Sequence, residues 1–282
     1  MFRIQTIAEA NPSDPFEARL LLGILDLRAK ALQFDRSRSD SELARMEFDE
    51  SYDPVWKALR ATRTSVMNIN RAIGDHIQKL SIESIVQFQS GAYSVSESID
   101  KLLRDEMASF LMNSVVAIKG TQRVMKWFGI NIGCLFVKPV NFERGVDVLR
   151  LEGHKALAQF LGEVRANWSE DVIHRRDSQE HSGWNLPSVE YRVVGSNKVE
   201  MIEPEIDRVP VRHFCMVTFN RISSFVEGVI AYGCKQLLHE PVVIVEIPRD
   251  QRDETCPVRF RLDLKRSGVE EWEICYSDSA YP

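Results

Sequence analysis

A short, highly charged segment in the second half of the chain holds the residue types that could do chemistry. The run from Asp171 to His181 reads Asp-Val-Ile-His-Arg-Arg-Asp-Ser-Gln-Glu-His. An imidazole can remove a hydroxyl proton and a guanidinium can stabilise a phosphorane, so His181 and Arg176 have the properties that phosphoester chemistry needs. Asp177 lies one turn before His181, where its carboxylate could hold the imidazole tautomer.

Arg176 is followed by a polar residue and, after four intervening residues, by His181. The segment resembles the Arg-x4-6-His signature of the HEPN superfamily of helical bundles. The resemblance covers about 141–238. It implies a metal-independent endoribonuclease in RNA processing or defence, with RNA as a partner, no cofactor, and a homodimer whose protomers each contribute a motif. Asp177 fits the family preference after the arginine. Gly183 replaces the tyrosine of the antitoxin-paired members, which argues against that branch.

Two neighbours extend the candidate site towards substrate binding. Arg175 also has an allowed spacing to His181, but we prefer Arg176 because Arg175 lies close to the apolar stripe of its helix. Trp184 follows in a turn, where packing is the favoured role and stacking on an RNA base is the functional one. No Cys or second close histidine completes a metal-ligand set with His174 and His181, so we expect no metal site.

The spacing of Arg176 and His181 sets a geometric condition on the site. Five residues along an ideal helix place two side chains about 140° apart around its axis. The two groups therefore converge only if the helix ends between them, and Gly183 makes a nearby helix end plausible.

The same residues also have a purely structural interpretation. Asp171 with Arg175, and Arg176 with Glu180, have the i,i+4 spacing of ordinary ion pairs, worth about 0.2–0.5 kcal/mol each on a solvated helix. His181 could be a last-turn histidine that the helix dipole favours. The alternative to the nuclease is therefore a non-catalytic, dimeric helical interaction module.

Composition describes an ordinary folded protein. Of 282 residues, 44% are apolar and 27% are charged, and the five cysteines include no CxxC pair. The formal charge of −5 provides no global attraction for a polyanion, so RNA would need a local basic patch. The start of the chain lacks the pattern of a secretion signal, and no run has the apolar length of a membrane span. We expect a cytoplasmic protein with no membrane partner.

Periodicity and capping signals predict a series of helices before the motif. Asp14-Pro15 begins a helix of about five turns, and Asp53-Pro54 begins a long second helix that continues to Leu80. The polar stretch 34–51 between them is predicted to be an exposed linker. Ser94 with Glu97 resembles a capping box that opens a third helix.

The second half of the chain mixes helices with strands. A helix near 141–151 is followed from Gly153 by the motif helix, whose apolar stripe is Leu157, Leu161, Val164, Trp168 and Val172. Alternation predicts a hairpin of 191–194 with 199–202 around the turn 195–198, and a short sheet from 242–247 and 258–264. Between them, Pro210 opens a helix that ends before Pro241.

These elements predict a mainly α fold, a HEPN-like helical bundle with β-hairpin insertions and a short C-terminal β-sheet. The predicted regions are a helical region at 1–90, the HEPN-like bundle at 91–240 and a β extension at 241–282, with a single domain throughout as the alternative.

Overall fold

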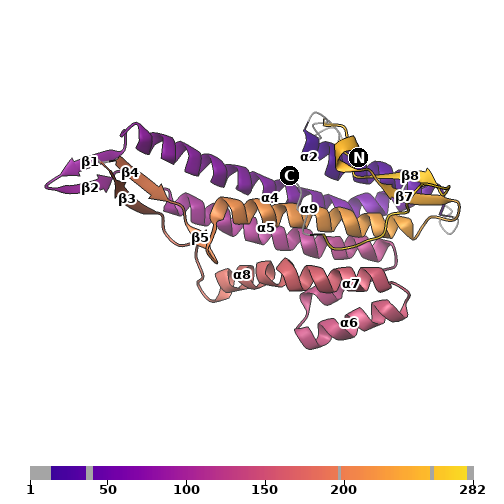
Figure 1. Cartoon of the computed structure of the whole chain (residues 1–282). Helices are drawn as coiled ribbons and strands as arrows, with labels where there is room; N and C mark the ends of the chain where they lie inside the picture. The colour runs from indigo at the N-terminus through magenta and orange to yellow at the C-terminus, as the bar shows by residue number, and fades with distance from the viewer. Residues whose placement is uncertain (1–13, 36–40, 196–197, 255–256, 278–282) are drawn as a thin grey trace. The chain divides into compact units, whose positions relative to one another are not determined.

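The computed structural model describes residues 14–35, 41–195, 198–254 and 257–277 (Figure 1). Their contacts divide into two compact units. Unit 1 combines 14–58, 116–170 and 222–277, and unit 2 combines 59–115 with 171–221. Within them the chain is mainly helical, with short antiparallel strand pairs between helices and a β hairpin in the C-terminal segment, which confirms the predicted mainly α fold with β-hairpin insertions. The division at 90 and 240 stays a prediction.

The first helical segment forms where the capping signal predicts it. Helix α2 (Pro15–Glu17), the π-helical turn η1 (Ala18–Gly23) and α3 (Ile24–Leu32) follow without interruption. The carboxylate of Asp14 accepts a hydrogen bond of 2.9 Å from the backbone N–H of Phe16, as an N-cap does. This segment packs in unit 1 through a stack of the Phe16 and Trp56 rings, whose centroids are 5.3 Å apart.

The long helix α4 (Ser41–Ser81) corrects two predictions. Residues 41–51 are helical rather than a linker, whereas 36–40 lie outside the described residues. Pro54 lies inside α4 and does not start it, although an interior proline removes one helical hydrogen bond and costs about 3 kcal/mol. Packing offsets that cost, because the flanking rings of Phe48 and Tyr52 are almost fully buried.

A hairpin replaces the predicted start of the third helix. Strands β1 (Val86–Gln89) and β2 (Ala92–Val95) pair in antiparallel register, with Phe88 opposite Tyr93. Helix α5 then runs over Asp100–Trp127. Ser94 therefore lies in β2 rather than at a helix cap, and the hydroxyl of Ser98 accepts a hydrogen bond from the N–H at the start of α5 instead.

The motif helix forms as its apolar stripe predicts. After the 3-10 turn η2 (Gly133–Phe136) comes α6 (Pro139–Leu151), and then α7 (Lys155–Val164), the π-helical η3 (Arg165–Ser169) and α8 (Glu170–His181) follow as one continuous run. Every member of the predicted stripe is buried: Leu157, Leu161, Val164, Trp168 and Val172.

The remaining strands flank the last long helix, α9 (Val211–Lys235). Before α9 come the hairpin of β3 (Glu190–Val194) with β4 (Lys198–Ile202) and the short pair β5 (Glu205–Ile206) and β6 (Val209–Pro210). After it, β7 (Val242–Glu246) and β8 (Phe260–Leu264) pair antiparallel around the turn η4 (Arg249–Gln251). Both predicted sheets are confirmed, although residues 196–197 of the predicted turn lie outside the described residues, and α9 begins one residue after Pro210.

Helix α9 is the one helix of the described chain that is both long and apolar enough to resemble a membrane span in composition. Of its most apolar 18-residue window, 61% is buried inside the fold. Its buried residues include Val226, Val229 and Ile230. Burial of this kind is typical of a core helix.

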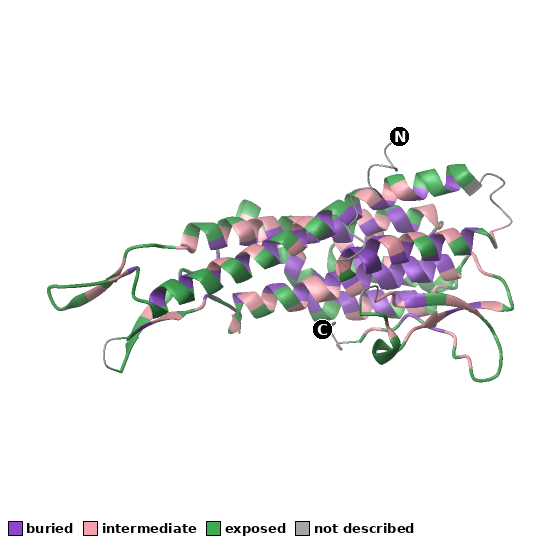
Figure 2. Cartoon of the chain, turned by 90° about the horizontal axis from the view of Figure 1, so that it is seen from above, coloured by how far each residue is buried: buried purple, intermediate pink, exposed green. Residues whose placement is uncertain are grey.

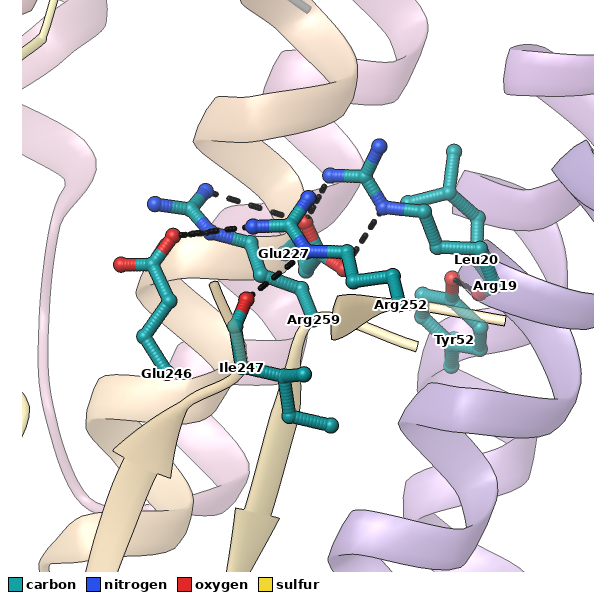
Figure 3. A network of polar contacts seen from close by, with 8 residues as sticks. All are labelled: Arg19, Leu20, Tyr52, Glu227, Glu246, Ile247, Arg252 and Arg259. Atoms are coloured by element: carbon teal, nitrogen blue, oxygen red, sulfur yellow. Dashed lines mark hydrogen bonds and ion pairs between the residues drawn. The ribbon is translucent and has the colours of Figure 1, made fainter. Parts of the chain in front are cut away.

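A buried polar network joins three parts of unit 1 (Figure 3). The side chains of Glu227 on α9 and Arg19 in η1 are 3% and 5% exposed and form a two-pronged ion pair, with Arg19 Nε 2.9 Å from one carboxylate oxygen. Arg259, beside β8, approaches the same carboxylate at 3.8 Å and donates to Glu246 on β7 at 2.8 Å. Burial lowers the pKa of Arg19 to about 10 and raises the pKa of Glu227, which indicates a high desolvation cost.

Unit 2 has a separate small core beneath the β1–β2 and β3–β4 hairpins. Leu80, Ile85 and Val199 are buried together, with the side chain of Tyr191 packed against them. On α4, His76 is 2% exposed, and its Nε2 shares a hydrogen bond of 2.8 Å with the Tyr191 hydroxyl. The outer surfaces of these hairpins are mostly exposed or half-exposed (Figure 2).

Because burial lowers the pKa of His76, we expect the fold to lose stability as the pH falls below about 6.5, the ordinary histidine pKa. Lys79 lowers this pKa further, whereas the carboxylates of Glu97 and Asp100 oppose the shift. Below pH 6.5 the histidine of the unfolded chain becomes protonated, whereas His76 in the folded chain stays neutral until the pH reaches its lower pKa. The unfolded state is therefore stabilised relative to the folded state. Urea denaturation between pH 7.5 and 5 measures the effect.

The free energy of unfolding should depend less on pH in a His76→Phe variant, which cannot titrate at this position. The dependence should persist in Tyr191→Phe, which keeps the imidazole. The same slope in His76→Phe as in the natural protein would assign the pH dependence to other groups.

Candidate functional site

The candidate site lies at the carboxyl end of α8, within unit 2. The helix ends at His181, and Gly183, whose φ of +71° suits glycine, follows two residues later. The N–H of Trp184 donates a hydrogen bond of 3.2 Å to the carbonyl of Ser178, which closes the helix end. Because the helix does not end between Arg176 and His181, the two side chains leave it in different directions.

Arg176 is held by two carboxylates on the same helix. Its Nη1 lies 2.9 Å from Asp177 Oδ1, and its Nη2 lies 2.8 Å from Glu180 Oε1. The side chain is 25% exposed. The guanidinium is therefore neutralised locally but remains accessible from solvent.

His181 is the most exposed member of the site, with 75% of its side chain open to solvent. Its Nε2 lies 3.8 Å from Glu180 Oε2, whereas the carboxylate of Asp177 binds Arg176. The carboxylate nearest the imidazole therefore belongs to Glu180 rather than to the predicted Asp177. Glu180 contacts both Arg176 and His181, a role that sequence reasoning missed although the Arg176–Glu180 spacing was recognised.

Arg175 and Trp184 come together in a different cluster. The Arg175 guanidinium lies 5.8 Å from the Trp184 ring centroid and 5.7 Å from that of Phe214 on α9. It forms ion pairs with Asp171, at 2.9 Å, and with Asp207 in the turn between β5 and β6. Its side chain is only 13% exposed. This arrangement fits a packing role, which was one of the two predicted for Trp184.

The segment after the motif is fastened to α5. Arg104 donates hydrogen bonds to the carbonyl of Leu186 at 3.2 Å and to the hydroxyl of Ser188 at 2.7 Å. The carboxylate of Asp100 accepts one from the N–H of Val189 at 2.7 Å. These contacts position the helix end that carries His181.

The described residues contain no group of three or more His, Cys, Asp or Glu side chains arranged to hold a metal ion. The side chains at the end of α8 are an exposed imidazole, a guanidinium and two carboxylates, and these are the groups available for chemistry there. Comparison of the chain with protein-family models, with curated proteins and with solved structures finds no match.

Proposed function

We propose that the chain is a metal-independent endoribonuclease of the HEPN type, which acts on RNA in the cytoplasm in RNA processing or defence. The observation that carries the proposal is the link through Glu180, whose two carboxylate oxygens face the Arg176 guanidinium at 2.8 Å and the exposed His181 imidazole at 3.8 Å. A proton acceptor and a cation thus share one solvent-exposed helix end.

The proposed reaction is an internal transesterification of RNA. His181 accepts the proton of the 2′-hydroxyl as the 2′-oxygen attacks the adjacent phosphorus, and the bond to the 5′-oxygen breaks. The leaving oxygen takes up a proton from a protonated imidazole. Arg176 stabilises the negative charge on the phosphorane. Before substrate binds, Asp177 holds the Arg176 guanidinium at the helix end through their ion pair.

The ion pairs of Arg176 do not prevent phosphate binding. Exposed pairs of this kind contribute about 0–1 kcal/mol each, and the Asp177 and Glu180 side chains are 51% and 41% exposed. A phosphate, which accepts two parallel hydrogen bonds from a guanidinium, can displace them. We infer that substrate binding exchanges these carboxylates for the scissile phosphate.

A second copy of the chain completes the proposed site. Within one chain α8 continues through His181, so Arg176 and His181 point about 140° apart around the helix axis. Two helix ends that face each other across a twofold axis would bring Arg176 of one protomer towards His181 of its partner. The proposal therefore includes a homodimer.

The alternative proposal is a non-catalytic, dimeric helical interaction module. The observation that favours it is the pairing of both arginines: Arg175 binds Asp171 and Asp207, and Arg176 binds Asp177 and Glu180. On this alternative the paired charges stabilise the helix end, and a partner protein contacts it.

Incubation of the purified protein with a mixed RNA pool in EDTA separates the two proposals. The nuclease cleaves RNA, loses cleavage in His181→Ala and keeps it in His174→Ala, which removes an exposed histidine two turns earlier on α8. If the unmodified protein does not cleave RNA, or if His181→Ala cleaves it equally well, the nuclease proposal is wrong and the interaction module remains.

A further inference from the structure

A groove lies in unit 1, apart from the α8 site, between α7 and the C-terminal segment. It has a volume of about 1030 Å³, and it is neither enclosed nor flat. One wall comes from α7, another from the β7–β8 hairpin, and a third from residues 268–276. Its volume is at the upper end of the range for small-ligand pockets, which leaves room for a short stretch of extended polypeptide.

The third wall is an extended strip of chain held against β7. The N–H of Trp272 donates a hydrogen bond of 2.8 Å to the carbonyl of Ile244. Along this strip Trp272 and Ile274 are 7% and 5% exposed, whereas Glu273 between them is exposed. The alternation is that of an extended strand, with apolar side chains on one side and a carboxylate on the other.

The charge of the groove is strongly unbalanced. Six carboxylates line it, and Arg261 is its one basic lining residue among those described. Three of the six have cationic neighbours: Glu246 with Arg259, Asp263 with Arg261, and Glu271 with Lys235. The other three are Glu163, Glu270 and Glu273, for which no ion pair occurs within the described part of the chain.

Aromatic rings lie among these carboxylates. Phe160 on α7 and Trp272 both line the groove and are each 7% exposed. Both rings pack against other aromatic rings, Phe225 and Phe260, so the carboxylates rather than the rings favour guanidinium and ammonium groups, through charge-assisted hydrogen bonds.

We propose that this groove binds an extended, Lys- or Arg-bearing segment of a partner protein. The groove provides an extended wall, a size suited to several residues and three carboxylates without cationic partners, and these features match a basic peptide. The proposal is independent of nuclease activity, since none of the groove residues belongs to the α8 site.

Fluorescence anisotropy with a labelled peptide of alternating Arg and Ala, titrated with the full chain at low salt, tests the proposal. We expect saturable binding that weakens at least tenfold in the double variant Glu270→Gln/Glu273→Gln, whose side chains are exposed and whose replacement should leave folding intact. A matched control, Glu143→Gln/Glu152→Gln, removes the same charge from exposed positions around α6 and should bind as the unmodified protein does.

Equal weakening by both double variants would reduce the interaction to net charge and overturn the groove assignment. Absence of saturable peptide binding would also overturn it. Spermine, a free polyamine, provides the last comparison. If the chain binds spermine more tightly than the peptide, and Glu270→Gln/Glu273→Gln abolishes spermine binding, the occupant of the groove is a small polycation instead of a protein segment. Circular dichroism of each variant confirms that the helices are retained.

Discussion

Replacing Glu227 with glutamine is expected to lower the free energy of unfolding by about 3 to 5 kcal/mol, the usual cost of breaking a buried ion pair. Glutamine has nearly the same shape but no charge, so the buried Arg19 guanidinium loses its counter-ion while it stays desolvated. Arg259, whose guanidinium lies 3.8 Å from the Glu227 carboxylate, loses one of its two carboxylate neighbours as well. Urea denaturation of the natural and variant proteins measures the loss.

The control is Glu240→Gln, which removes a carboxylate that pairs with Lys265 but is 83% exposed. We expect that variant to change stability by less than about 1 kcal/mol. An equally small effect of Glu227→Gln would mean that the network is not held as tightly as its burial implies.

A double variant distinguishes the value of the pair from the cost of breaking it. Desolvation is the largest influence on the pKa of both Arg19 and Glu227, so an apolar pair could be nearly as stable as the ionic one. Arg19→Met combined with Glu227→Leu should therefore be less destabilised than Glu227→Leu alone. Full recovery is not expected, because Arg259 would still lose the Glu227 carboxylate and keep only Glu246 as a carboxylate neighbour.

Local signals predicted the helices well where burial and capping agreed. The Asp14 cap and the stripe from Leu157 to Val172 depend on neighbouring residues only, and both are present in the structure. Pro54 was misread because its position suits a helix start, whereas α4 continues through it with Phe48 and Tyr52 buried, and Phe48 packs on the rings of Trp127 and Phe128, which are distant in the sequence. The hairpin before α5 was missed although Ser90 and Gly91, both with positive φ, form a suitable turn.

The candidate site divides in the same way. The pairs Asp171–Arg175 and Arg176–Glu180 follow from i,i+4 spacing, and the sequence predicted both. Arg175 also contacts Asp207 and Phe214, which are distant from it in the sequence, and no local sequence pattern predicts such contacts. The sequence predicted Glu180 as an ion-pair partner of Arg176. Its contact with His181 could not be predicted, because it depends on the continuation of α8 to His181.

Two inactive variants are expected to restore RNA cleavage when they are combined. On the proposed mechanism, His181→Ala and Arg176→Ala each lower the cleavage rate by about 100-fold or more, since one loses the proton acceptor and the other the phosphorane-stabilising cation. Each composite site takes Arg176 from one protomer and His181 from the other. A mixed dimer of the two variants then has one site with both residues intact and one with neither.

Random pairing makes half of all dimers mixed, so co-expression of equal amounts should recover about a quarter of the natural activity. The two copies carry different affinity tags, and sequential purification isolates the mixed dimer, which should reach about half. A site formed within one chain would give no recovery, because every chain in the mixture lacks one of its two residues. Sedimentation of the natural protein and of each variant measures the proposed dimer, so a failure to recover activity by variants that do dimerise would count against the shared site.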